Sequence, residues 1–147
     1  MNIKTSTVKY IGDLRTEAIH LASHNVIITD APTDNQGKGQ AFSPTDLLCT
    51  SLASCMLTIM GIAANTYNQS SVKGSTLNID GTIAEVTKIM TSGPRRVSEI
   101  YIDVTMPFQE YQEKERQILE NAARTCPVAL SINPAIIQKI NFIYPQK

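Results

Sequence analysis

The sequence has no tryptophan, only two histidines and three cysteines, and its 13 basic side chains equal its 13 acidic ones in number. A zero formal charge gives no basic surface for a nucleic acid, and the scattered aromatic residues form no stacking platform for single strands. The two histidines, His20 and His24, have no cysteine or acidic residue at ligand spacing, so we expect no metal and no other cofactor.

The chain also lacks an apolar run near its start, where a secretory signal would lie, so we expect a cytoplasmic protein. An odd number of cysteines in a reducing compartment argues against a disulfide framework and leaves buried, catalytic or redox thiols as alternatives. The length of 147 residues suits one domain with a real core, and no repeat or linker divides it. We therefore expect a single domain over residues 1–147.

The longest uncharged stretch follows a strong helix-start signal. Ser43 is a good N-cap, Pro44 fits the first helical position, and Asp46 completes a capping box. These residues predict a helix that begins with the stretch 43–64 and ends near residues 65–68. A helix of roughly 22 residues would be about 33 Å long. Its apolar seam is expected to contain Leu48, Leu52, Cys55, Ile59 and Ile62.

This predicted helix is apolar almost all round, which places it at the centre of the fold or between subunits. Its Ser, Thr and Gly residues and its strong cap argue against a membrane span. The first strands should form an antiparallel meander with a turn at Gly12-Asp13. A loop over residues 30–40 follows, and a loop of this length is expected either to have a function or to fold over another part of the chain. The meander strands are predicted over residues 3–11, 14–21 and 26–29. Later strands are predicted over residues 75–88 (with a bulge or bend at Gly81), 97–106 and 136–144, and helices over 109–124 and 128–132. This order indicates an α+β fold around an antiparallel or mixed sheet.

The three thiols differ in their local setting. Cys126 precedes Pro127 at a predicted helix N-terminus, where the helix dipole favours a thiolate, although a small buried residue is an equal alternative. Cys55 lies in the middle of its helix, where apolar burial would raise the pKa of its thiol. We therefore interpret it as a core residue unless a cation from elsewhere in the chain reaches the thiol. Cys49 faces about 240° away from Cys55 around the helix, so we assign it to the core.

Two motifs taken together resemble the OsmC/Ohr family, the osmotically inducible and organic hydroperoxide resistance proteins. They are the segment 43–48 leading to Ser54-Cys55, and the segment 122–128 with Thr125-Cys126-Pro127. The order of the elements matches along nearly the whole chain. The resemblance implies an OsmC-like α+β fold with antiparallel or mixed sheets around a long buried helix. It also implies an intertwined homodimer with two active sites at the subunit interface.

The resemblance further implies a thiol-dependent peroxidase that reduces organic hydroperoxides under oxidative stress, with electrons from a dithiol such as a lipoylated protein. Cys55 would be the peroxidatic thiolate that becomes a sulfenic acid, and Cys126 would resolve it as a disulfide. Arg15, the only arginine before the long helix, would stabilise the thiolate and bind the peroxide oxygens.

One position departs from the family pattern. The residue after the proline is typically a glutamate that holds the arginine, whereas here it is Thr45, with Asp46 next to it. We expect these two residues to bind substrate or position Arg15. The alternative is a non-enzymatic OsmC-like module that binds a lipophilic molecule at the dimer interface. A weaker third possibility is thiol transfer or hydrolysis by Cys55 with His20 or His24.

Overall fold

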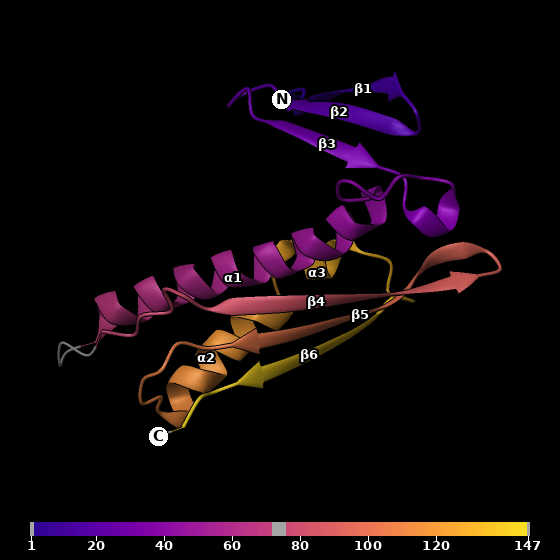
Figure 1. The fold of residues 1–147 in the computed structure, drawn as a ribbon. Helices are drawn as coiled ribbons and strands as arrows, with labels where there is room; N and C mark the ends of the chain where they lie inside the picture. Colours follow the sequence, from indigo (N-terminus) through magenta and orange to yellow (C-terminus); the bar gives the residue numbers. More distant parts are fainter. Residues whose placement is uncertain (1, 72–75, 147) are drawn as a thin grey trace. The chain divides into compact units, whose positions relative to one another are not determined.

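The computed structural model describes residues 2–71 and 76–146, which form two compact units, Met1–Leu48 and Cys49–Lys147 (Figure 1). The first unit contains β1 (Ser6–Gly12), β2 (Arg15–His20), β3 (Val26–Asp30), the 3-10 helix η1 (Thr33–Asn35) and the first turn of α1 (Pro44–Ser70). The second contains the rest of α1, then β4 (Ile83–Ser92), β5 (Arg95–Thr105), α2 (Glu113–Arg124), α3 (Pro127–Ser131) and β6 (Ile137–Ile143). The predicted α+β fold class is confirmed.

The first unit is the expected antiparallel meander in the order β1-β2-β3. Its first turn lies one residue later than predicted, because Asp13 and Leu14 both take left-handed conformations with φ of 54° and 60°. Two such residues match the twist of the flanking strands in a tight hairpin. Consequently β2 begins at Arg15 and not at Leu14.

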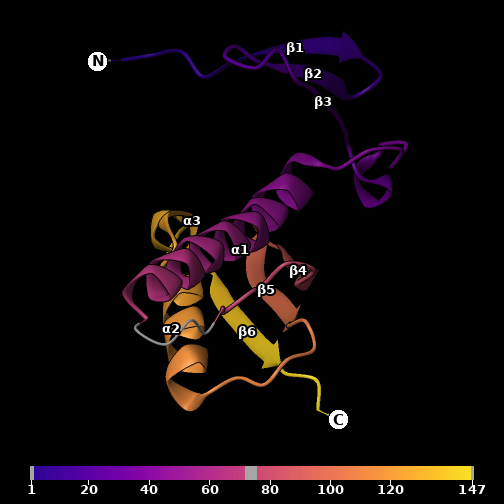
Figure 2. The same cartoon turned by 90° about the vertical axis from the view of Figure 1, so that its left-hand side faces the viewer.

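The second unit is built on a mixed sheet in which β5 pairs antiparallel with β4 and parallel with β6. Alternate residues of β5, namely Ile100, Ile102 and Val104, are fully buried on one face. Helices α1 and α2 lie over that face (Figure 2). The same cluster includes the fully buried side chains Cys49, Leu52, Met56, Met60, Leu119, Ala123 and Cys126.

The start of α1 follows the predicted capping box. The Asp46 N–H donates to Ser43 Oγ at 3.1 Å, and the Ser43 N–H donates to Asp46 Oδ2 at 2.9 Å. The helix ends at Ser70, slightly beyond the expected residues 65–68. By length and composition it is the one helix among the described residues that could cross a membrane, but the core helix of a globular domain meets the same test.

The predicted apolar seam of α1 is partly wrong. The buried face is formed by Cys49, Leu52, Ala53, Met56, Met60 and Ala64. Of the predicted seam, Leu48 is 36% exposed and Ile62 is 59% exposed in the single chain. The physical reason is that a helix with apolar residues on every side carries no periodic signal for the face that meets the sheet.

The strand predicted over residues 75–88 is also corrected, and its first residue lies outside the described part. Leu77 is buried, but both its N–H and its carbonyl are bonded by the Asn68 side chain, at 2.7 and 2.9 Å. This segment therefore satisfies its backbone without a neighbouring strand. Of the two alternatives at Gly81, the chain bends there: Gly81, with φ of 87°, lies in a turn before β4. The irregular register of the strand pair occurs between Ile89 and Met90.

The helix predicted from residue 109 begins four residues later. Gln112 is the N-cap of α2, and its N–H donates to Glu115 Oε2 at 2.8 Å in a capping box. Tyr111 is buried as expected, but it precedes the helix. The short helix α3 and the closing strand β6 lie where the sequence predicted them, within one residue at each end.

Candidate functional site: two neighbouring thiols and an ion pair

Two of the predicted site residues, Cys55 and Cys126, meet in the second unit. Cys55 is half-buried in the middle of α1, and Cys126 is completely buried as the N-cap of α3. The two thiols are neighbours that interact electrostatically, and neither is in a disulfide. Proximity of two thiols is the first requirement for their reversible conversion to a disulfide.

The α3 terminus holds the Cys126 thiol in place. Pro127 occupies the first turn of the helix, and the Ala129 N–H donates to Cys126 Sγ at 3.4 Å. Burial nevertheless raises the pKa of Cys126, the Ala129 N–H lowers it, and the hydrogen bond to Cys55 raises it further. The expectation that the helix terminus would favour a Cys126 thiolate is thus outweighed by loss of solvation. Cys126 is a neutral thiol near pH 7.

Cys49, the third thiol, is 1% exposed and belongs to the core cluster of the second unit. Its assignment to the core is confirmed. It provides a natural reference for Cys55, because both cysteines lie on α1 and the Cys55 thiol is the one whose interaction raises the pKa of Cys126.

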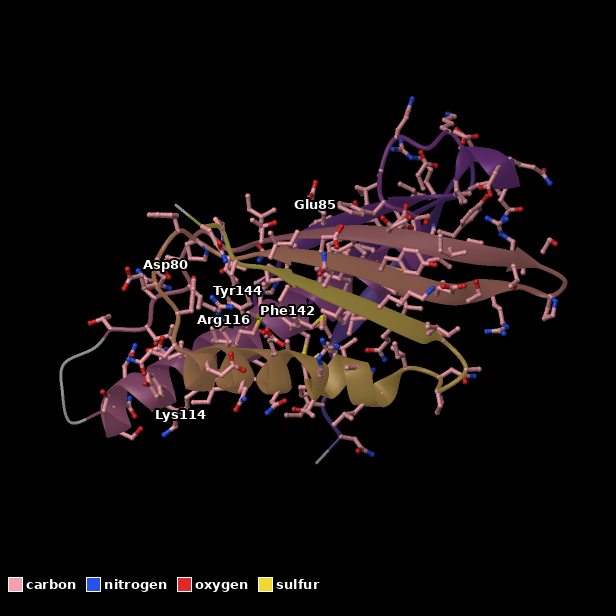
Figure 3. All side chains as sticks on the ribbon, turned by 90° about the horizontal axis from the view of Figure 1, so that it is seen from below. Asp80, Glu85, Lys114, Arg116, Phe142 and Tyr144 are labelled. Atoms are coloured by element: carbon pink, nitrogen blue, oxygen red, sulfur yellow. The ribbon has the colours of Figure 1, made fainter. Side chains whose placement is uncertain are left out.

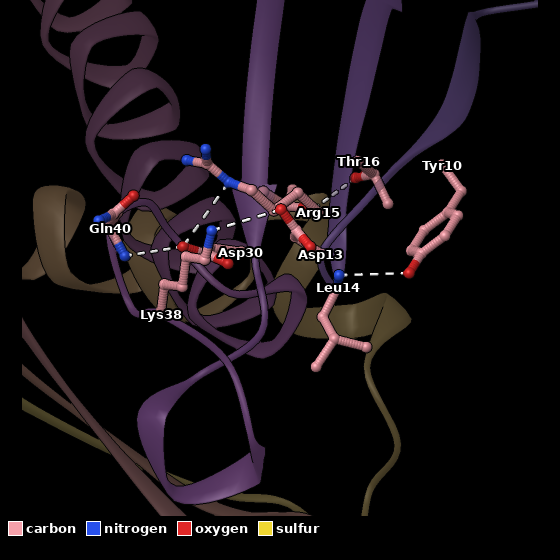
Figure 4. Close-up of polar contacts among 9 residues, drawn as sticks. Tyr10, Asp13, Leu14, Arg15, Thr16, Asp30, Lys38 and Gln40 are labelled. Carbon is pink, nitrogen blue, oxygen red and sulfur yellow. Dashed lines mark hydrogen bonds and ion pairs between the residues drawn. The ribbon is translucent and has the colours of Figure 1, made fainter.

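The first unit contains Arg15, the cation predicted for the site. Arg15 and Asp30 are register partners on β2 and β3, and Arg15 Nε lies 3.8 Å from Asp30 Oδ2 (Figure 4). The Asp30 side chain is fully buried, whereas that of Arg15 is 29% exposed. This geometry lets Asp30 orient the arginine side chain through its buried Nε.

The loop over residues 30–40 folds around Asp30. The Gln40 N–H donates to Asp30 Oδ2 at 2.9 Å, and the Asp30 N–H donates to the Phe42 carbonyl at 3.0 Å. Within the loop, Gly37 approaches the Ala31 carbonyl so closely that an added Cβ would overlap it. The loop is therefore a compact structure that positions one carboxylate, in line with the expectation that so long a loop is not idle.

Asp30 is the residue that sequence reasoning missed. The signal that could have found it is the register of the β2–β3 hairpin, which pairs Arg15 with Asp30. The turn of this hairpin is closed by a backbone hydrogen bond from the His20 N–H to the Asn25 carbonyl. Asp46, which we considered as a partner for Arg15, contributes its carboxylate to the α1 cap. Thr45 Oγ1 lies 3.2 Å from Ser43 Oγ in the same turn.

The remaining polar candidates do not assemble into a further centre. His20 Nδ1 lies 2.6 Å from Ser23 Oγ in an exposed turn, where His24 has a φ of 60°. Across residues 2–71 and 76–146 there is no group of three or more His, Cys, Asp or Glu side chains placed to hold a metal ion.

Comparison with other proteins agrees with this architecture. The family profile described as OsmC-like protein matches residues 37–141. A crystal structure from Psychrobacter arcticus 273-4, provisionally assigned to the osmotic stress and detoxification response, is 58% identical over 97% of both chains, with a TM-score of 0.87. No curated protein matches the chain significantly.

More distant structures share the fold. An OsmC-like protein from Mycoplasma pneumoniae is 18% identical over 99% of this chain and all of its own, with a TM-score of 0.73. An organic hydroperoxide resistance protein OsmC from Legionella pneumophila is 16% identical over 97% of this chain and 99% of its own, with a TM-score of 0.67. A long helix over a mixed sheet, with a separate N-terminal meander, is the fold of the OsmC and Ohr proteins. This chain belongs to the OsmC-like protein family.

Proposed function

We propose that the protein is a cytoplasmic, thiol-dependent peroxidase that reduces organic hydroperoxides. The interaction between the neighbouring thiols of Cys55 and Cys126, neither of which is in a disulfide, is the observation that carries this proposal. Cys55 is the more exposed of the two and can meet a substrate, whereas Cys126 is buried behind it as a neutral thiol. This difference in exposure supports the attacking role for Cys55 and the resolving role for Cys126.

The proposed cycle has three steps. The Cys55 thiolate attacks the distal peroxide oxygen, so that an S–O bond forms, the O–O bond breaks, and the alkoxide leaves and takes a proton from water. The Cys126 thiol then attacks the Cys55 sulfenic acid, forming the disulfide and releasing water. A dithiol, such as a lipoylated protein, reduces this disulfide by exchange and is itself oxidised.

In this proposal Arg15 is the cation that stabilises the thiolate and binds the peroxide. The support is its ion pair with buried Asp30, which orients an arginine side chain that is 29% exposed as a whole. Asp30 supplies the negative partner that the family pattern places after the proline of the helix start. Thr45 and Asp46, in the first turn of α1, remain candidates for contacts with the substrate.

We also propose that the protein is a homodimer. The three strands of the first unit expose large apolar side chains, with Val8 63%, Tyr10 64% and Val26 53% exposed, and α1 exposes Ile62. A sheet of this size needs a partner surface to be stable, and apolar patches of this kind mark interfaces. Sedimentation equilibrium should give twice the 16.1 kDa chain mass. A monomer at micromolar concentration would contradict the dimer.

One equivalent of cumene hydroperoxide tests the peroxidase proposal. In the reduced wild type it should produce a Cys55–Cys126 disulfide, mapped by alkylation and peptide mass spectrometry. In Cys126→Ser it should leave a Cys55 sulfenic acid that dimedone captures. Because burial raises the pKa of Cys126, disulfide formation in the wild type should accelerate as the pH rises from about 7 to about 9.

The same experiment separates the enzyme from the binding module. In a module with inert thiols, cumene hydroperoxide leaves Cys55 unoxidised, and iodoacetamide reaches Cys55 only after denaturation. Either of these results would overturn the peroxidase. Cys49 is the internal reference, since it should be alkylated only in the denatured chain.

A further inference from the structure

A row of charged and aromatic side chains joins α2 to β6 in the second unit. The Arg116 guanidinium lies 4.5 Å from the centre of the Tyr144 ring (Figure 3). The Tyr144 ring meets the Tyr111 ring edge-on at 5.0 Å, and its hydroxyl donates to Glu120 Oε1 at 2.9 Å. Two turns further along α2, Arg124 lies 5.3 Å from the centre of the Phe142 ring. The two arginines of this row thus make cation–π interactions with aromatic rings.

Arg116 differs from an ordinary surface arginine because one of its donors is not matched by an acceptor. Its Nε is buried and has no hydrogen-bond partner in the part of the chain that the structure describes. The neighbouring acids are engaged elsewhere, with Glu115 in the α2 cap and Glu120 accepting from Tyr144. A buried donor without an acceptor is unfavourable, so the guanidinium gains little from the chain at this atom and can direct its Nη groups to a ligand.

Arg116 also lines a cleft of about 620 Å³ that we call the Arg116 cleft. Its walls include Phe108, which is 60% exposed, together with Tyr111 and Pro145. Burial raises the pKa of Tyr111, so its hydroxyl stays neutral. The charged lining thus consists of the Arg116 guanidinium and Glu110, which is exposed and solvated. The volume lies within the range of small-molecule sites.

We propose that the Arg116 cleft binds a small monocarboxylate with an apolar, aromatic body. A planar guanidinium pairs with a carboxylate through two parallel hydrogen bonds. The ring of such a ligand would pack against Phe108 and Pro145. One cation suits one negative charge, whereas a phosphate dianion would keep excess charge beside Glu110. The site shares no residue with the thiol pair or Arg15, so it stands apart from the proposed peroxidase.

Titration with benzoate, followed by ¹⁵N NMR, tests the Arg116 cleft. We expect saturable shifts of the Arg116 Nε–H signal and of the backbone amides of Phe108, Tyr111 and Gln146. Benzamide, which has the same shape without the charge, should cause no saturable shift. Arg116→Gln should weaken benzoate binding by about tenfold or more, which corresponds to roughly the loss of one charge-assisted pair.

Arg124→Gln is the matched control, because Arg124 also lies on α2 over an aromatic ring but does not line the cleft. It should bind benzoate as the wild type does. Arg116→Lys keeps the charge without the planar fork and should bind with intermediate affinity, provided that its spectrum shows a folded protein. The proposal is overturned by equal shifts with benzamide, by absence of saturation, or by unchanged benzoate binding in folded Arg116→Gln. Peroxide turnover should be unaffected by Arg116→Gln, so the two proposals fail independently.

Discussion

Cys55→Ser is expected to abolish turnover of cumene hydroperoxide with a dithiol reductant, with a rate loss on the order of 10³-fold or more. A serine hydroxyl is not ionised near neutral pH and cannot form the sulfenic acid on which the cycle depends. The change removes one sulfur from a half-buried position, so the fold should survive it. Peroxide consumption in a coupled assay measures the effect directly.

Cys49→Ala is the matched control for this prediction. It removes a thiol from the same helix, but from the buried face that packs on the sheet. We expect a lower melting temperature with peroxide turnover within about threefold of the wild type, since no reacting atom is changed. Equal turnover in Cys55→Ser and in the wild type would refute the peroxidase. Loss of turnover in a folded Cys49→Ala protein would show that the chemistry has been assigned to the wrong thiol.

Asp30→Asn is expected to lower the rate constant for the reaction of Cys55 with peroxide by about 10- to 100-fold. The amide can still accept the Gln40 N–H, but it no longer attracts the Arg15 guanidinium, from which it is 3.8 Å away. A less well-positioned cation favours the thiolate less, so the pH–rate profile should move to higher pH. The stability loss should be about 1–3 kcal/mol in urea unfolding, because the ion pair is only partly exposed.

Asp13→Asn is a suitable comparison, because Asp13 also forms an ion pair in the first unit. Its carboxylate lies 3.4 Å from Lys38 Nζ, and both side chains are well exposed. Exposed pairs contribute about 0–1 kcal/mol, so neither stability nor the pH–rate profile should change. A pH–rate profile of Asp30→Asn that coincides with that of Asp13→Asn would show that Asp30 is structural only. An upward shift in Asp30→Asn alone would support its role as a positioning residue.

Much of the fold could be predicted because its signals are local. The Ser43 and Asp46 cap, the break at Cys126-Pro127 and the alternating residues of β5 each act within one turn or one strand. The two cysteine motifs likewise marked the residues that the structure brings into contact, although their separation along the chain hides that contact. Their chemical roles remain predictions.

Features that depend on distant contacts could not be predicted in this way. The all-round apolar α1 does not specify its buried face, which the sheet selects by packing on Met56 and Met60. The pairing of Arg15 with Asp30 depends on the register between two strands, and the pKa of Cys126 depends on burial that outweighs its helix terminus. Backbone propensity and capping are short-range, so the chain itself determined where most elements begin and end. Register, burial and solvation arise from contacts between residues far apart in sequence, and only the tertiary structure decided them.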